Sequence, residues 1–244
     1  MSSPGASASM GRVLLVCEDS VVIQQLAEGM QQLAIATEVC MDVSVARHLV
    51  NCKKFEAIIV DLSLTEADEV LGQVRLSPSN RTAVTFAVTD QGKPARFEIQ
   101  PNFVMEKPLS SGSVGRTFKA AFGLIVRERR RSFRCPINIS AQIQTGGEEA
   151  NCQVVNISEG GLAVSATQAL KPGMRVRVRF MLPGQPVQFK IEAEACWCDE
   201  KGRAGLRSLL IPSDQLPILQ QWLAAKLEED LPESVVRQFR KEKE

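Results

Sequence analysis

The chain has 244 residues, of which 44% are hydrophobic and 23% are charged, and its formal net charge is +1. This length is more typical of two domains than of one, and the composition is that of a globular protein with enough apolar residues for two cores. A net charge so close to zero provides no overall attraction to nucleic acid or to a membrane surface, so any such attraction must come from a local patch.

The N-terminus, the cysteines and the histidine content exclude several classes of protein. Residues 1–10 are small and uncharged, which predicts a disordered tail and not a signal peptide. No apolar run approaches the ~20 residues that span a bilayer, so we expect a cytoplasmic protein without a membrane span. The seven cysteines lack the spacing of a disulfide framework and predict reduced thiols. Because His48 is the only histidine, we expect no enzymatic activity.

Strands alternate with helices in the first half of the chain. Continuous apolar runs predict strands that are buried on both faces at residues 12–18 and 55–61, and two more strands are predicted at 83–89 and 102–107. Apolar residues at helical spacing predict helices at 20–33 (capped by Ser20), at 44–53 and from Ser113 to residue 130. This alternation is typical of a doubly wound α/β fold with a parallel sheet.

From Ile137 onward the apolar residues recur with a period of two. In 175–180 three arginines alternate with apolar residues, and in 188–198 the apolar positions run as far as Trp197, which we expect on the inner face. Short strands between Gly- and Pro-containing turns predict a small antiparallel β-barrel, followed by a helix at 213–229. The predicted domains are a tail at 1–10, an α/β domain at 11–126, a β-barrel domain at 127–227 and a charged tail at 228–244.

Polar residues follow the predicted strands of the first domain. They are Glu18, Asp19, Asp61, Thr89 and Lys107. Because the carboxyl ends of parallel strands converge on one edge of a sheet, we expect these side chains to meet there. Three carboxylates would suit Mg²⁺, and a hydroxyl and an ammonium beside them could hold a phosphoryl group on Asp61.

These five residues, in this order, resemble the receiver domain of response regulators over residues 11–126. The resemblance implies that Glu18 and Asp19 bind Mg²⁺ together with Asp61, and that a histidine kinase phosphorylates Asp61. It also implies that Thr89 and Lys107 support the phosphoryl group. The chain lacks the proline that usually follows the acceptor aspartate, and prolines interrupt the region of the fourth helix, so the resemblance is to a degenerate receiver.

The only dense charge patch is the segment RERRRSFR at residues 127–134, which contains five arginines. Arginine presents a planar fork of donors that fits phosphate oxygens and the guanine edge. The segment NISEGG follows at residues 156–161, where Asn156 and Ser158 lie on the same side of an extended strand. The glycines after them permit a sharp turn or a close approach of the backbone to a ligand.

Together the two segments resemble the PilZ domain, a receptor for cyclic di-GMP. Arg130 and Arg134 match its RxxxR motif, and three further residues match its [D/N]xSxxG motif: Asn156, Ser158 and Gly161. The resemblance implies that the two arginines contact phosphates and guanine edges, and that the asparagine and the serine bond a base or the ligand backbone. Either Arg129 or Arg131 would add stacking on a base.

The sequence therefore predicts a cyclic di-GMP-binding signalling protein with an unidentified downstream partner. Because five neighbouring arginines repel one another, we expect residues 127–136 to be mobile without ligand. A dianionic ligand would order them and reorient the receiver-like domain on the barrel. One alternative is a nucleotide-independent adaptor for protein interactions. A nucleic-acid-binding protein is less favoured, because aromatic residues make up only 5% of the chain and no recognition helix is present.

Overall fold

The computed structural model describes residues 11–92, 97–166 and 170–229. The chain divides into two compact units, the first ending at Ser132 and the second spanning Phe133–Glu229. The predicted tail at 1–10 and nearly all of the predicted tail at 228–244 lie outside the described residues. Among the described helices, none has the length and apolar character needed to cross a membrane.

The first unit is a five-stranded sheet with the strand order β2-β1-β3-β4-β5, in which all neighbouring strands are parallel. Its elements are β1 Gly11–Val16, α1 Ser20–Gln31, β2 Ile35–Cys40, α2 Val43–Cys52, β3 Ala57–Asp61, α3 Asp68–Leu76, β4 Val84–Asp90, β5 Phe103–Lys107 and α4 Ser111–Ser132. The predicted doubly wound α/β fold is confirmed.

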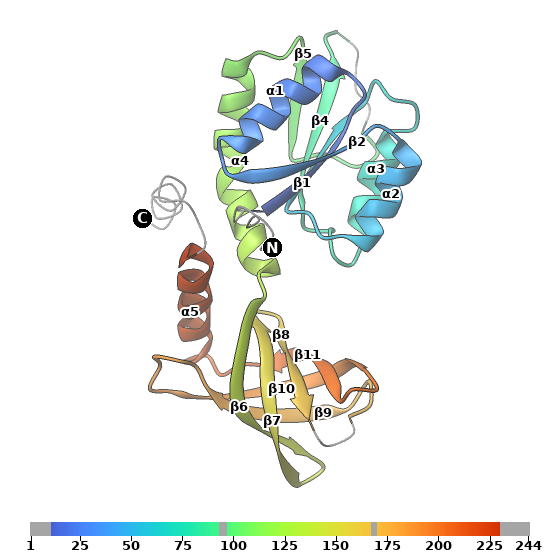
Figure 1. The fold of residues 1–244 in the computed structure, drawn as a ribbon. Coiled ribbons are helices and arrows are strands. Elements are labelled where there is room, and N and C mark those ends of the chain that lie inside the picture. The colour runs from blue at the N-terminus through green and yellow to red at the C-terminus, as the bar shows by residue number, and fades with distance from the viewer. Residues whose placement is uncertain (1–10, 93–96, 167–169, 230–244) are drawn as a thin grey trace, which may run out of the picture. The chain divides into compact units, whose positions relative to one another are not determined.

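Helices cover both faces of this sheet. Figure 1 shows α1 and α4 on one face and α2 and α3 on the other. The central strand β3 is buried along its whole length, as its continuous apolar sequence predicts. On the α4 side the core contains three phenylalanine rings: Phe86 stacks on Phe103 at 5.2 Å between centroids and meets Phe118 edge-on at 5.6 Å.

The structure differs from the sequence-based prediction at three places in this unit: strand β2, helix α3, which the sequence did not predict either, and the cap of helix α1. Strand β2 was not predicted, because it is an edge strand whose half-exposed sequence IATEVC lacks a long apolar run. Helix α1 is capped by Asp19 and not by Ser20, since the Asp19 carboxylate accepts from two backbone amides of the first turn. Among the described residues between β4 and β5 there is no helix, as the prolines there predict.

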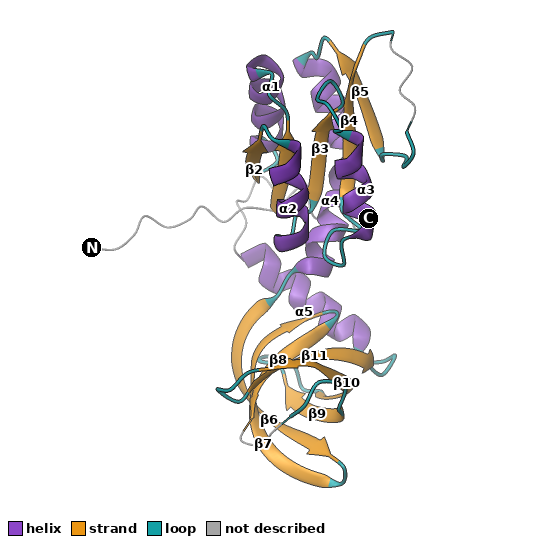
Figure 2. Cartoon of the chain, turned by 90° about the vertical axis from the view of Figure 1, so that its right-hand side faces the viewer, coloured by secondary structure: helices purple, strands orange, loops and turns teal. Residues whose placement is uncertain are grey.

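The second unit is a closed antiparallel barrel with the strand order β10-β11-β8-β7-β6-β9, followed by one helix (Figure 2). Its elements are β6 Cys135–Thr145, β7 Glu148–Ser158, β8 Gly161–Ala166, β9 Arg175–Met181, β10 Gln188–Cys198, β11 Arg203–Leu210 and α5 Leu216–Glu229. The predicted small barrel with a C-terminal helix is confirmed.

Strand alternation fills the barrel interior. In β9 Val176, Val178 and Phe180 are buried and the arginines that alternate with them point outward, as the period of two predicts. Phe180 of β9 stacks on Phe189 of β10 with their ring centroids 5.4 Å apart. Helix α5 is tied to its own unit by the indole of Trp222, which donates to the carbonyl of Pro183 at 3.1 Å.

Candidate functional site

The carboxylate of Asp61, the last residue of β3, lies at the predicted edge of the first sheet and is 2% exposed. Its Oδ2 accepts hydrogen bonds from Lys107 Nζ at 2.7 Å and from the Cys17 thiol at 3.2 Å. Its Oδ1 accepts a hydrogen bond from the backbone amide of Ser63 at 3.0 Å. Lys107 Nζ also donates to Ser63 Oγ at 3.0 Å. Both oxygens of the expected phosphoryl acceptor are therefore bonded to groups of its own unit.

These contacts shift three pKa values. Burial alone raises the pKa of Asp61, but the hydrogen bonds from Lys107, Ser63 and Cys17 outweigh burial and hold this pKa below its usual value. Burial lowers the pKa of Lys107, and the bond to Asp61 more than offsets it, so the net shift is upward. Burial and the bond to Asp61 raise the pKa of the Cys17 thiol to about 12. At neutral pH an ammonium and a neutral thiol thus face a carboxylate.

The remaining residues of the predicted phosphoryl site are less closely engaged. Glu18 is exposed, Asp19 caps α1, and Thr89 is 6% exposed near the end of β4. Within the described part of the chain, no group of three or more His, Cys, Asp or Glu side chains could hold a metal ion. The Mg²⁺ site formed by Glu18, Asp19 and Asp61 stays a prediction. Asp19 is used as a helix cap, and both oxygens of Asp61 are bonded.

Helix α4 carries the arginine segment as far as Ser132, so residues 127–132 are helical. Arg131 is exposed, as is Arg134, which lies just beyond the helix. Arg129 Nη1 lies 3.7 Å from the buried carboxylate of Glu56. Of the two arginines considered for base stacking, Arg129 is therefore engaged with an acid of the first unit and Arg131 is exposed. The charge of Arg129 is thus opposed by one buried acid.

Ser158 and Gly161 shape the turn between β7 and β8. The Ser158 side chain is buried, and its hydroxyl donates to the carbonyl of Gly161 at 3.0 Å. A Cβ atom on Gly161 would lie 2.1 Å from the backbone oxygen of Leu206 in the adjacent strand β11. Ser158 and Gly161 therefore both shape this turn, and the ligand contact that the sequence predicts for Ser158 stays a prediction.

Asn156 differs from these two residues, because its side chain has an unused acceptor. Its side-chain carbonyl oxygen is buried and receives no hydrogen bond from any described residue. A buried acceptor without a donor is unfavourable, and a bound ligand with an N–H group would satisfy it. The guanine base has such groups at its N1 and N2 positions.

Trp197 lies in the same cross-strand row as Asn156, and sequence reasoning missed this. Asn156 pairs with Ala163, Ala163 with Gly205, and Gly205 with Trp197, across strands β7, β8, β11 and β10. The prediction that Trp197 faces the interior is wrong. A bulge between Ala195 and Trp197 shifts the alternation by one residue, which leaves Trp197 48% exposed with its indole against Gly205.

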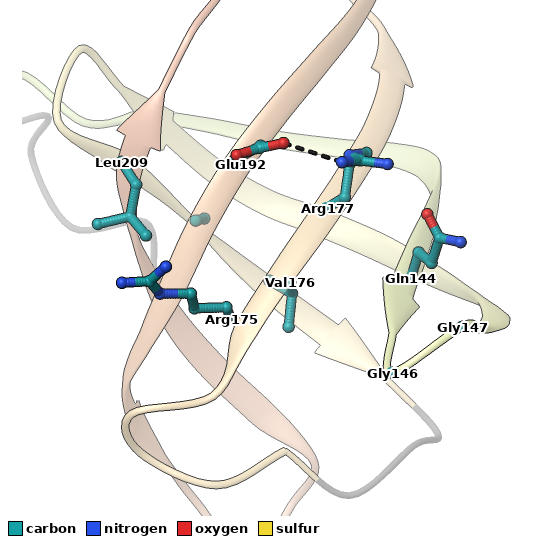
Figure 3. Close-up of a pocket in the computed structure, with 9 residues that line it drawn as sticks. Gln144, Gly146, Gly147, Arg175, Val176, Arg177, Glu192 and Leu209 are labelled. Carbon is teal, nitrogen blue, oxygen red and sulfur yellow. Dashed lines mark hydrogen bonds and ion pairs between the residues drawn. The ribbon is translucent and has the colours of Figure 1, made fainter.

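The pocket in Figure 3 contains none of the predicted ligand residues. It is a hollow of about 310 Å³ beside the β6–β7 turn, and its lining includes Gly146, Arg175, Arg177 and Glu192. Arg177 and Glu192 pair with each other at 2.9 Å. The motif turn begins at Ser158, at the opposite end of the 11-residue strand β7. The hollow is therefore distinct from the motif residues.

Parts of this chain are similar to known proteins. The family model of the PilZ domain matches residues 128–225. No curated protein matches the chain. A solved structure of the Bacillus subtilis inhibitor of motility (MotI/DgrA) is 25% identical with a TM-score of 0.34, and the match covers 38% of this chain and 48% of that chain, about half of its length.

Two other solved structures match one part of the chain each. The receiver domain of the Pseudomonas aeruginosa PAO1 sensor histidine kinase PA1611 is 18% identical, with a TM-score of 0.42 and coverage of 46% of this chain and 98% of that one. The PilZ domain of CeSA from a cellulose-synthesizing bacterium is 19% identical, with a TM-score of 0.32 and coverage of 38% and 97%. The chain therefore has a parallel α/β unit followed by a closed β-barrel unit, and the family model that matches residues 128–225 is that of the PilZ domain.

Proposed function

We propose that this protein is a cytoplasmic signalling receptor for cyclic di-GMP and not an enzyme. The observation that carries the proposal is the buried, unused acceptor of Asn156 within a PilZ domain that retains both motif segments. A guanine N–H would supply the missing donor. The ligand is a dianion, and the arginine segment provides the opposite charge.

Each motif residue would have its own role in binding the ligand. Arg130 and Arg134 bind the phosphates and guanine edges by charge-assisted hydrogen bonds. Arg131, which is exposed, stacks on a base. Ser158 and Gly161 act mainly by shaping the turn that follows Asn156.

Trp197 would add a second stacking surface for a guanine base. It is half-exposed, and only the small residues Ala163 and Gly205 separate it from Asn156 in the cross-strand row. Four neighbouring strands span about 14 Å, so a base between Asn156 and Trp197 could reach both. Stacking of a base on an aromatic side chain contributes about 1–3 kcal/mol.

The same binding event would act on the receiver-like unit. Arg130 and Arg131 precede the junction of the two units at Ser132 and Phe133, and Arg134 follows it. A ligand bound to arginines on both sides of this junction would restrict the connection and reorient the receiver-like unit on the barrel. An unidentified downstream protein would recognise the changed arrangement. Phosphorylation of Asp61 by a histidine kinase would be a second signal to the same protein.

A fluorescence titration tests the proposal. The chain has two tryptophans, and Trp197 lies in the same cross-strand row as Asn156. Cyclic di-GMP should therefore change the emission saturably, while GTP at the same concentration should not. Trp197→Phe should remove most of the change. Hydrogen exchange on the same samples should show added protection in residues 133–136, which lie beyond the end of helix α4. Absence of any saturable response to cyclic di-GMP would refute the receptor function.

A further inference from the structure

Two buried carboxylates, Glu56 and Glu128, meet the last turns of α4 inside the first unit. Glu56 is 2% exposed and directly precedes β3, and Glu128 is 5% exposed and lies within the arginine segment. A buried carboxylate is costly unless it is paired and hydrogen-bonded. The hydrogen-bond partners of Glu56 and Glu128 therefore show which parts of the unit these carboxylates hold together.

Glu128 lies in line with the row of buried apolar residues through which α4 packs on the sheet. The apolar members of this row recur every three or four residues and are Val114, Phe118, Ala121 and Ile125. The same spacing leads to Glu128 and then to Ser132. Glu128 Oε1 accepts a hydrogen bond from Lys54 Nζ and one from Thr82 Oγ1 at 2.8 Å. Beyond the apolar row, polar contacts thus continue to hold the helix on its unit.

Glu56 holds the final residue of the same helix. Its Oε1 accepts from Ser132 Oγ at 2.8 Å and lies 3.7 Å from Arg129 Nη1. Its Oε2 accepts from the backbone amide of Arg12 at 2.6 Å. A Cβ atom on Gly11 would lie 2.7 Å from this oxygen, so glycine leaves the room that the carboxylate occupies. One carboxylate therefore connects the first strand, the start of β3 and the end of α4.

We infer that Glu56 and Glu128 are positioning residues for nucleotide binding, acting through Ser132 and Thr82. Their contacts with Ser132 and Thr82, which we call the α4 anchor, fix the last turn of α4, and Glu56 also pairs with Arg129. Arg130 and Arg131, in the same turn, are therefore held in a helical conformation before the ligand binds. Ordering in advance reduces the entropic cost of binding. This inference rests on the proposed receptor function, and it assigns a role in ligand affinity to residues of the receiver-like unit.

Two substitutions that each remove a single hydrogen bond test the α4 anchor, because each buried glutamate keeps its other partners. Ser132→Ala removes one hydrogen bond to Glu56, and Thr82→Val removes one hydrogen bond to Glu128 while keeping the side-chain shape. Each should weaken cyclic di-GMP affinity about threefold to tenfold, and the double variant should weaken it further. Hydrogen exchange without ligand should show faster exchange in residues 127–132. Ser132→Thr, which keeps the hydroxyl, should restore wild-type affinity.

Ser113→Ala is the matched control, because Ser113 bonds Ser110 at the opposite end of the same helix. It should loosen the start of α4 and leave the affinity unchanged. If the double variant exchanges faster in residues 127–132 but binds cyclic di-GMP as tightly as the wild type, the positioning role is refuted. Failure of the wild type itself to bind cyclic di-GMP would instead refute the receptor function.

Discussion

The role of Gly161 in the β7–β8 turn leads to a quantitative prediction. In Gly161→Ala the new Cβ would lie 2.1 Å from the backbone oxygen of Leu206, so β8 and β11 must separate by about 1 Å to reach a normal contact. Such overpacking costs about 1–3 kcal/mol. The separation also strains the hydrogen bond from the Ser208 amide to the Gly160 carbonyl, now 3.0 Å, which adds about 1 kcal/mol. We expect a total loss of about 2–4 kcal/mol.

Tryptophan fluorescence measures this loss selectively, because both tryptophans, Trp197 and Trp222, belong to the second unit. The midpoint of thermal unfolding should fall by roughly 10–25 °C for a domain of this size. Gly160→Ala is the matched control, since a Cβ there meets no atom within 4 Å, and it should change the midpoint little. A Gly161→Ala protein with wild-type stability would refute the assignment of this glycine to strand packing.

Three further predictions concern single side chains. Because burial raises the pKa of Cys17 to about 12, iodoacetamide at pH 8 should label the exposed Cys52 and Cys196 in the native protein but not Cys17, as mass spectrometry can establish. The folded-state pKa of Asp61 lies below 3.8, so its contribution to stability is present above about pH 4 and lost as the pH falls further. The difference in unfolding free energy between wild type and Asp61→Asn should therefore shrink in acid, and a difference that grows there would contradict the contacts described. Asn156→Ala should weaken cyclic di-GMP binding about threefold to tenfold without destabilising the free protein, and a clear loss of stability would show that its oxygen is already satisfied.

Local sequence patterns predicted a strand correctly where its burial follows a regular pattern of apolar residues. The run AIIVD of β3 predicts a central parallel strand because both of its faces are covered. Edge strand β2 could not be predicted in the same way, because only its first and last residues are buried and its sequence has no continuous apolar run. Trp197 was misplaced because a single bulged residue reverses the alternation, and no local signal marks a bulge in the sequence CWC.

The site was predictable in its residues but not in their roles. The spacing of the motif residues indicated Asn156, Ser158 and Gly161, and the glycines indicated a turn. Only the structure shows that the Ser158 hydroxyl bonds within the turn and that Gly161 packs against β11. The anchor of α4 was invisible in the sequence, because Glu56 and Ser132 are 76 positions apart and neither belongs to a local pattern. Contacts of this kind depend on the packing of helix against sheet.

The most direct test of the receptor function is calorimetric titration of cyclic di-GMP into the wild type, Arg130→Ala and Arg134→Ala at one salt concentration. We expect saturable binding by the wild type and affinity at least about tenfold weaker in each variant, because each loses a charge-assisted contact. Wild-type affinity in both variants, or no binding by the wild type, would contradict the proposal that the arginine segment holds the nucleotide.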